Sequence, residues 1–350
     1  MQISKQNLEV ILKDRFGLAS FRAGQLEAIN VLMEKNRLLC IQPTGHGKSL
    51  LYQMPTVLLD GITLVISPLL ALMRDQISQL TNRFKIPAAS INSDQEEYEN
   101  NSAKIAAKTG KIKILFVAPE QLDDIDRFDF LLALPISLIV IDEAHCISTW
   151  GHDFRPSYRQ IIKLVQALEN KNPSIKVLGL TATANHKTQA DIVQQLSANI
   201  PVLVQRSNMD RPNIKLSVIE ARGLANKLFY VKQLIEMLPG DGLIYCSTRE
   251  NTEVVAKYCQ KQNIRAVAYH AGIDSSEKIK LQNEFISGKY KVIAATNALG
   301  MGIDKSNLRF IIHFDVPGSI TAYYQEVGRA GRDGLPADGI ILYDSSDKKI

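Results

Sequence analysis

Residues 38–49 read LLCIQPTGHGKS, and this stretch decides the fold. Its four apolar residues predict a buried strand, and the glycine-containing segment after them predicts a tight loop. The LLYQ that follows at residues 50–53 is consistent with the start of a helix. A strand, a glycine-containing loop and a helix in this order are typical of a phosphate-binding loop in an α/β domain.

The loop contains the residue types that bind the phosphates of a nucleotide. Lys48 would reach the β- and γ-phosphates, and the Ser49 hydroxyl would bind Mg²⁺. Gln42 replaces the first glycine of the standard pattern, so a glycine-rich turn with an exposed lysine is the alternative. The candidate nucleotide-binding residues of the loop are Thr44, Gly45, His46, Gly47, Lys48 and Ser49.

Short apolar runs recur along the chain and alternate with helical patterns such as residues 251–262. Runs this short, rich in Val and Ile, predict strands that are buried on both faces. We therefore predict an α/β protein with two tandem domains, each a mostly parallel sheet flanked by helices. The runs lie at residues 38–41, 64–66, 114–117, 138–141, 177–180, 243–245, 266–269, 292–294, 310–312 and 340–343.

A polar segment, RSNMDRPN at residues 206–213, separates the two series of strands. Within it, Asp210, Arg211 and Pro212 predict a linker. The predicted domains are residues 1–207, which contain the phosphate loop, and residues 208–350.

Composition limits the classes of protein that need to be considered. The net charge of +5 permits a polyanionic partner without requiring one. Neither a signal peptide nor an apolar run long enough to span a bilayer is evident, so we expect a soluble protein with no membrane partner. The four cysteines lack the close spacing of a zinc site, which predicts buried reduced thiols and a cytoplasmic location.

A second motif ends the apolar run at residues 138–141, which continues as DEAH. Asp142 would hold Mg²⁺ through water, and Glu143 would orient and deprotonate the attacking water. A helix-capping role for Glu143 is the alternative reading of this motif taken alone.

A third motif, YYQEVGRAGRDG, occupies residues 323–334. Arg329 and Arg332 are three residues apart, so a helical turn would place both on one side. Guanidinium groups suit the charge of a phosphoryl transition state, whereas a solvated basic turn paired with Asp333 is the alternative. Together the motifs predict an enzyme in which one domain holds ATP and the other supplies arginines.

In this order the motifs resemble the superfamily-two helicases, and specifically the RecQ family, over about residues 8–345. The most diagnostic part is DEAHCISTWGHDFRP at residues 142–156. The resemblance implies that the two domains are RecA-like. It also implies that Arg22 and Gln25 contact the adenine base, so that ATP is preferred over GTP.

Other residue roles follow from the resemblance alone. Asp304 would lie near the nucleotide, and His145 and Gln325 would pass the nucleotide state between the domains. The residues implied to contact DNA are Ser67, Pro68, Trp150, Phe154, Arg155, Ser247, His270 and Thr296. The alternative for Trp150 is packing against the surface of its domain, and a lone histidine such as His270 is more often structural.

The resemblance implies a DNA helicase. Mg²⁺-dependent ATP hydrolysis would drive 3′-to-5′ movement on single-stranded DNA and unwinding in repair, recombination or replication. The implied partners are single-stranded and partly duplex DNA and a single-stranded-DNA-binding protein, and we expect a monomer. The alternatives are an RNA helicase, a nucleic-acid clamp without catalysis, and a P-loop switch or small-molecule kinase. Relatives commonly continue into zinc-binding and winged-helix regions, which we do not expect in this chain because no cysteine follows Cys259.

Overall fold

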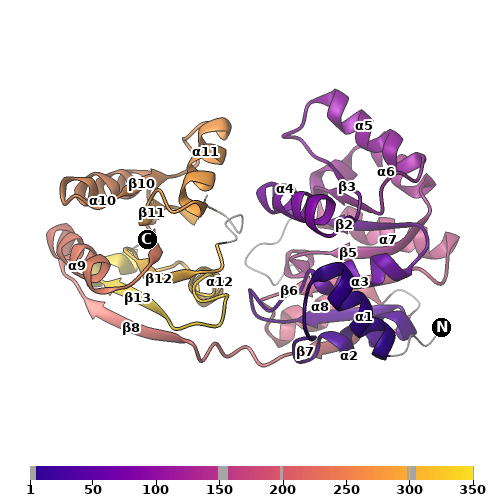
Figure 1. The fold of residues 1–350 in the computed structure, drawn as a ribbon, viewed down its shortest axis with the longest axis horizontal. Coiled ribbons are helices and arrows are strands. Elements are labelled where there is room, and N and C mark those ends of the chain that lie inside the picture. The colour runs from indigo at the N-terminus through magenta and orange to yellow at the C-terminus, as the bar shows by residue number, and fades with distance from the viewer. Residues whose placement is uncertain (1–4, 149–156, 198–199, 298, 300–304, 350) are drawn as a thin grey trace. The chain divides into compact units, whose positions relative to one another are not determined.

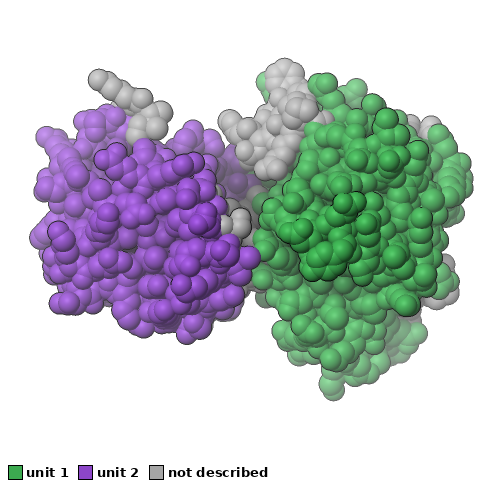
Figure 2. Space-filling model, turned by 90° about the horizontal axis from the view of Figure 1, so that it is seen from above, with its two compact units in different colours: residues 1–209 green, residues 210–350 purple. Residues whose placement is uncertain are grey.

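The computed structural model describes residues 5–148, 157–197, 200–297, 299 and 305–349. The chain divides into two compact units, unit 1 at residues 1–209 and unit 2 at residues 210–350 (Figure 2). Each unit is described by itself below.

Unit 1 is built on a seven-stranded sheet with the strand order β3-β4-β2-β5-β6-β1-β7 (Figure 1). Each neighbouring pair in this order runs parallel. The strands are β1 (Arg37–Ile41), β2 (Ile62–Ile66), β3 (Ala88–Ile91), β4 (Ile114–Val117), β5 (Ile136–Ile141), β6 (Lys176–Thr181) and β7 (Leu203–Arg206). The helices are α1 (Lys5–Phe16), α2 (Gln25–Lys35), α3 (Leu50–Leu58), α4 (Leu70–Ser78), α5 (Glu97–Lys108), α6 (Ile125–Ala133), α7 (Tyr158–Lys171) and α8 (His186–Leu196).

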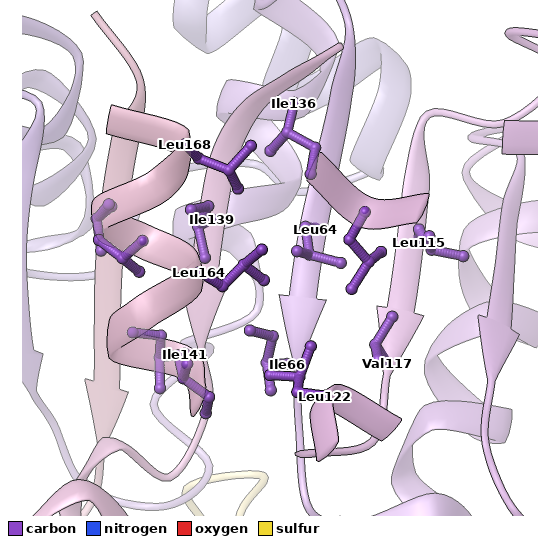
Figure 3. Packing of buried hydrophobic residues seen from close by; sticks show 14 of the residues in the cluster. Leu64, Ile66, Leu115, Val117, Leu122, Ile136, Ile139, Ile141, Leu164 and Leu168 are labelled. Atoms are coloured by element: carbon purple, nitrogen blue, oxygen red, sulfur yellow. The ribbon is translucent and has the colours of Figure 1, made fainter. Parts of the chain in front are cut away.

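Alternate residues of each central strand of unit 1 enter two different apolar clusters. Leu64 and Ile66 of β2 belong to the cluster that packs against α5, α6, α7 and α8, whereas Val65 joins the cluster beneath α1, α2, α3 and α4. Figure 3 shows the first cluster, with Leu164 and Leu168 of α7 lying over the sheet. Both faces of the sheet are therefore buried, which explains why its strands are continuous apolar runs.

Unit 2 has a six-stranded sheet with the order β10-β11-β9-β12-β13-β8, and its neighbouring strands also run parallel. Helices α9 and α10 cover one face, and α11 and α12 cover the other. The strands are β8 (Ile214–Glu220), β9 (Asp241–Tyr245), β10 (Ala266–Tyr269), β11 (Val292–Ala295), β12 (Leu308–His313) and β13 (Ala337–Tyr343). The helices are α9 (Gly223–Met237), α10 (Arg249–Lys261), α11 (Ser275–Ile286) and α12 (Ile320–Val327), and a short 3-10 helix follows at Ser345–Lys349.

These sheets confirm the predicted fold class, and each of the ten predicted runs lies in a strand. Three strands were not predicted: β3, β7 and β8. All three lie at sheet edges, and β7 and β8 are mostly exposed, so no continuous apolar run marks them.

The four cysteines are buried and unpaired, as the sequence predicted. Among the described residues, none of the helices combines the length and apolar character that crossing a membrane requires.

A buried ion pair offers a test of how unit 1 is stabilised. Arg37 of β1 is fully buried, and its Nη2 lies 3.1 Å from Glu169 Oε1 on α7. Burial lowers the Arg37 pKa, and Glu169 partly opposes this shift. We expect Glu169→Leu to lower the free energy of unfolding by about 3–5 kcal/mol, because it leaves a buried guanidinium without its carboxylate. Urea unfolding followed by circular dichroism would measure this change.

The double variant Arg37→Met with Glu169→Leu should recover most of that loss, since neither charge then remains buried. Glu9→Gln, which removes an exposed pair with Lys5, should change stability little. An unaltered unfolding curve for Glu169→Leu would contradict this account.

Candidate nucleotide and nucleic-acid site

In unit 1, the predicted motifs follow four strands that are adjacent in the order β2-β5-β6-β1. Ser67 follows β2, Asp142 follows β5, and the phosphate loop follows β1. The sequence TAT at residues 181–183, which we call the threonine motif, overlaps the end of β6. Because the strands are parallel, their carboxyl ends meet at one edge of the sheet, where ligands of open α/β sheets bind.

The phosphate loop has the backbone conformation that its glycines permit. Gly45 and Gly47 have φ angles of 76° and 84°, in the left-handed region. Helix α3 begins directly after Ser49. Lys48 Nζ donates to the carbonyl oxygens of Gln42 and Pro43 at 3.1 and 3.2 Å, which holds the ammonium group over the loop.

The predicted base-recognition residues contact the phosphate loop directly. The Arg22 guanidinium donates to the Gly45 carbonyl. Gln25 Nε2 donates to the carbonyl oxygens of Gly47 and His46 at 3.1 and 3.3 Å. Gly47 has a φ of 84°, which favours glycine, and a Cβ atom there would lie 2.7 Å from this nitrogen, so that the Gln25 side chain would have to move. The structure thus brings residues 22–25 and 44–49 into one cluster.

Asp142 occupies the end of β5 with hydrogen bonds to both carboxylate oxygens. Ser67 Oγ donates to Oδ2 at 3.0 Å, and the backbone N–H of Glu143 donates to Oδ1 at 3.0 Å. Burial and the neighbouring Glu143 raise the Asp142 pKa to about 6, although Lys48 and these hydrogen bonds lower it. The carboxylate therefore lies where a further positive charge would stabilise it.

This environment fits Mg²⁺. A phosphate-loop magnesium site needs one hydroxyl, one carboxylate and the phosphates, and Ser49 and Asp142 would provide the protein part. It does not need a cluster of protein ligands. In the described part of the chain, no three His, Cys, Asp or Glu side chains gather as a group able to hold a metal.

Glu143 and His145 connect the acidic motif to the threonine motif. Glu143 is buried and has φ and ψ of 48°, an uncommon conformation for a residue other than glycine. Its Oε2 lies 3.2 Å from His145 Nδ1, which is also 3.0 Å from Thr181 Oγ1. Because Thr181 Oγ1 donates to the Thr183 carbonyl, we assign the proton to His145 Nδ1.

Unit 2 places three of the predicted residues at one edge of its sheet, after the adjacent strands β10, β11 and β9. Ser247 follows β9 and is exposed, and its backbone N–H donates to Asp315 Oδ2 at 2.7 Å. Thr296 follows β11 and is buried. His270 follows β10, and both of its ring nitrogens have partners within unit 2. Its Nε2 lies 3.0 Å from Glu253 Oε1, and its Nδ1 accepts from the Gly272 N–H.

The arginine motif lies at the end of α12 and in the turn after it. Gln325 is in the helix, Arg329 is buried and Arg332 is half-buried. Arg329 Nε and Nη1 have no hydrogen-bond partner among the described residues. Asp333 forms its ion pair with Arg309, at 2.5 Å, so this carboxylate is engaged by an arginine outside the motif.

Sequence reasoning missed the residue that fixes this turn. Arg211, predicted to be part of a linker, donates to the carbonyl oxygens of Gly328, Ala330 and Gly331 at 2.8–3.0 Å. Asn213 Nδ2 donates to the Gly331 carbonyl at 2.9 Å. The contacts join residues more than a hundred positions apart, and the only signal in the sequence was an arginine beside Pro212 in a polar segment.

Four predicted residues lie outside the described part of the chain. They are Trp150, Phe154, Arg155 and Asp304.

The sequence matches two protein families. Residues 22–192 match the DEAD/DEAH box helicase family, and residues 226–334 match the helicase conserved C-terminal domain. Among solved structures, that of Saccharomyces cerevisiae Dbp5 bound to RNA and ADP BeF3 is similar with a TM-score of 0.76 and 17% identity, covering 98% of this chain and 89% of that one. The structure of Mycobacterium smegmatis Lhr bound to single-stranded DNA and AMP-PNP is similar with a TM-score of 0.73 and 20% identity, covering 95% of this chain and 47% of that one.

Curated relatives are more similar in sequence. The ATP-dependent DNA helicase RecQ of Pasteurella multocida is 41% identical over 98% of this chain and 53% of its own length. The probable ATP-dependent DNA helicase RecS of Bacillus subtilis is 41% identical over 98% of this chain and 68% of its own length. The chain thus spans about half to two thirds of the length of these relatives. With this identity, two helicase family matches and parallel α/β folds in both units, the chain belongs to the RecQ family of ATP-dependent DNA helicases.

Proposed function

We propose that this chain is the motor of a DNA helicase, which hydrolyses ATP with Mg²⁺ and moves 3′-to-5′ on single-stranded DNA to unwind duplexes. The observation that carries the proposal is the position of Asp142. This half-buried carboxylate, hydrogen-bonded to Ser67, lies at the same sheet edge as the phosphate loop and is influenced electrostatically by Lys48. We further propose a cytoplasmic monomer that acts in DNA repair, recombination or replication, with a single-stranded-DNA-binding protein as partner.

Different residues of unit 1 would have different roles in ATP hydrolysis. Lys48 would bind the β- and γ-phosphates, and Arg22 and Gln25 would bind the adenine. Ser49 and Asp142 would hold Mg²⁺, which when bound neutralises phosphate charge. Glu143 would orient and deprotonate the attacking water, and His145 lies 3.2 Å from its carboxylate, where it holds the side chain in place.

Arg329 and Arg332 would stabilise the charge that develops on the phosphate. The buried Arg329 N–H groups without a partner among the described residues are donors that an anionic oxygen would satisfy. A contribution of roughly 10³–10⁵ in rate is typical for an arginine in this role. Asp304 would lie near the nucleotide, and His145 and Gln325 would pass the nucleotide state between the domains. The residues that would contact DNA are Ser67, Pro68, Trp150, Phe154, Arg155, Ser247, His270 and Thr296.

RNA as the substrate is the second candidate, because Dbp5, which shares the fold, was solved bound to RNA. The relatives with 38–41% identity are named DNA helicases, which favours DNA. A clamp without catalysis has no need for a buried acidic pair beside a phosphate loop, since burying these charges costs free energy.

Steady-state phosphate release, measured with single-stranded DNA, with RNA and without nucleic acid, tests the proposal. We expect DNA to stimulate hydrolysis more than RNA does. Lys48→Ala should abolish hydrolysis through loss of phosphate binding. Glu143→Gln should retain ATP binding but lower the rate by roughly 10²–10⁴, the usual contribution of a general base.

Lys5→Ala, at an exposed position in α1, is the control and should leave the rate unchanged. Full activity of Glu143→Gln would show that this carboxylate is not the base, and hydrolysis that no nucleic acid stimulates would contradict a coupled motor.

The raised pKa of the half-buried Asp142 carboxylate also predicts a pH-dependent stability. Its pKa is about 6 in the folded chain and ~3.9 when unfolded, so ionisation destabilises the fold increasingly above pH ~4 and fully above about 6. Asp142→Asn should therefore raise the free energy of unfolding at pH 8 by about 1–3 kcal/mol in EDTA without nucleotide, and by about half as much at pH 5. Thermal unfolding at the two pH values measures this difference. An Asp142→Asn variant that is less stable at pH 8 would show that the charged form is the one favoured by the fold.

A further inference from the structure

A buried hydrogen-bonded group in unit 1 joins helix α3 to helix α4. Gln76 of α4 accepts two hydrogen bonds at its Oε1, from Tyr52 Oη and from Gln53 Nε2 of α3, each at 3.1 Å. The three side chains are buried. We refer to Tyr52, Gln53 and Gln76 as the α3–α4 triad.

The triad lies in an apolar environment, where breaking a hydrogen bond costs more free energy than it does at the surface. Tyr52 packs edge-to-face on Phe116 of β4, with ring centroids 6.5 Å apart, within the apolar cluster beneath α1, α2, α3 and α4. Burial raises the Tyr52 pKa well above its ordinary value, so its hydroxyl remains a donor. Both lone pairs of Gln76 Oε1 are used, and a shift of α4 against α3 would break both of these hydrogen bonds in an apolar region.

The triad lies between two functional segments. On one side, α3 begins directly after Ser49 of the phosphate loop. On the other side, α4 begins at Leu70, shortly after Ser67 and Pro68, which are proposed to contact DNA. Ser67 Oγ is itself bonded to Asp142 at 3.0 Å. The segment from residue 67 to residue 76 is therefore tied to the nucleotide site at both of its ends.

The same segment presents charge to solvent. Arg74 lies two residues before Gln76, its side chain is 47% exposed, and it pairs with Asp94 at 3.3 Å. An exposed arginine in a weak surface pair is able to exchange its carboxylate for a phosphate of a nucleic-acid backbone. A strand that binds here would act on a helix that cannot move independently of the phosphate loop.

We propose that Tyr52, Gln53 and Gln76 are positioning residues that couple nucleic-acid binding at residues 67–75 to the phosphate loop. The coupling rests on the proposed function, since it presupposes hydrolysis that DNA stimulates. The triad itself touches neither ligand. It transmits the position of α4 to the start of α3 through two buried hydrogen bonds.

A double-mutant cycle tests the coupling. Tyr52→Phe removes only the hydroxyl, and Gln76→Met removes the shared acceptor with little change in volume. Phosphate release is measured without DNA and at saturating single-stranded DNA, and the ratio of the two rates is the readout. We expect each variant to lower this ratio by roughly three- to tenfold, the effect of one buried hydrogen bond, and the double variant to lower it no further than Gln76→Met alone.

Tyr98→Phe is the matched control, because the Tyr98 ring is 72% exposed on α5 and its loss of a hydroxyl should leave the ratio unchanged. Thermal unfolding and fluorescence anisotropy with labelled single-stranded DNA show that the variants fold and still bind the strand. A merely structural role would lower both rates by the same factor, and that result would overturn the coupling. Effects of Tyr52→Phe and Gln76→Met that multiply in the double variant would also overturn it.

The two proposals fail in different ways. If single-stranded nucleic acid does not stimulate hydrolysis by the unmodified chain, both the proposed function and the coupling are overturned. If single-stranded DNA stimulates the unmodified chain, and stimulates both variants by that same factor, only the coupling is overturned.

Discussion

Withdrawing a carboxylate from water costs free energy, and the nucleotide site of unit 1 is organised around one such group, the half-buried Asp142. Its strand β5 lies inside the sheet between β2 and β6. Ser67 and the Glu143 N–H satisfy the two oxygens, yet the pKa remains raised to about 6. The ionised Asp142 carboxylate is therefore unfavourable in the chain alone and becomes favourable when a cation and phosphates bind beside it.

The groups around this carboxylate are held by contacts that reach across the sheet edge. Gln25 and Arg22 bond to the phosphate loop, and His145 bridges Glu143 and Thr181. The α3–α4 triad extends the same connected set to the segment that begins at Ser67. The nucleotide site and the segment at residues 67–76 are therefore linked by hydrogen bonds at both ends of that segment, which is a physical basis for coupling between them.

Unit 2 holds its arginine motif by different means. The turn after α12 is fixed by Arg211, which donates to the carbonyl groups of Gly328, Ala330 and Gly331. Gly331 has a φ of 56°, and a Cβ atom there would lie 2.5 Å from Asn213 Nδ2. Asp333 is bound by Arg309. Hydrogen bonds to backbone carbonyl groups therefore fix the turn that carries Arg329 and Arg332.

The sequence by itself determined the α/β class, the central strands and the motif residues at their ends. Strands buried on both faces must be apolar throughout, and polar residues directly after them must lie at the sheet edge. Edge strands such as β8 escaped prediction because half of their surface meets water and leaves no apolar run. Only the tertiary structure decided that Gln76 pairs with Tyr52, that Arg211 anchors the arginine turn and that both nitrogens of His270 are engaged. Apart from the local bond between Gly272 and His270, these contacts join residues 17 or more positions apart. A hydrogen bond between such residues leaves no periodic pattern in the sequence.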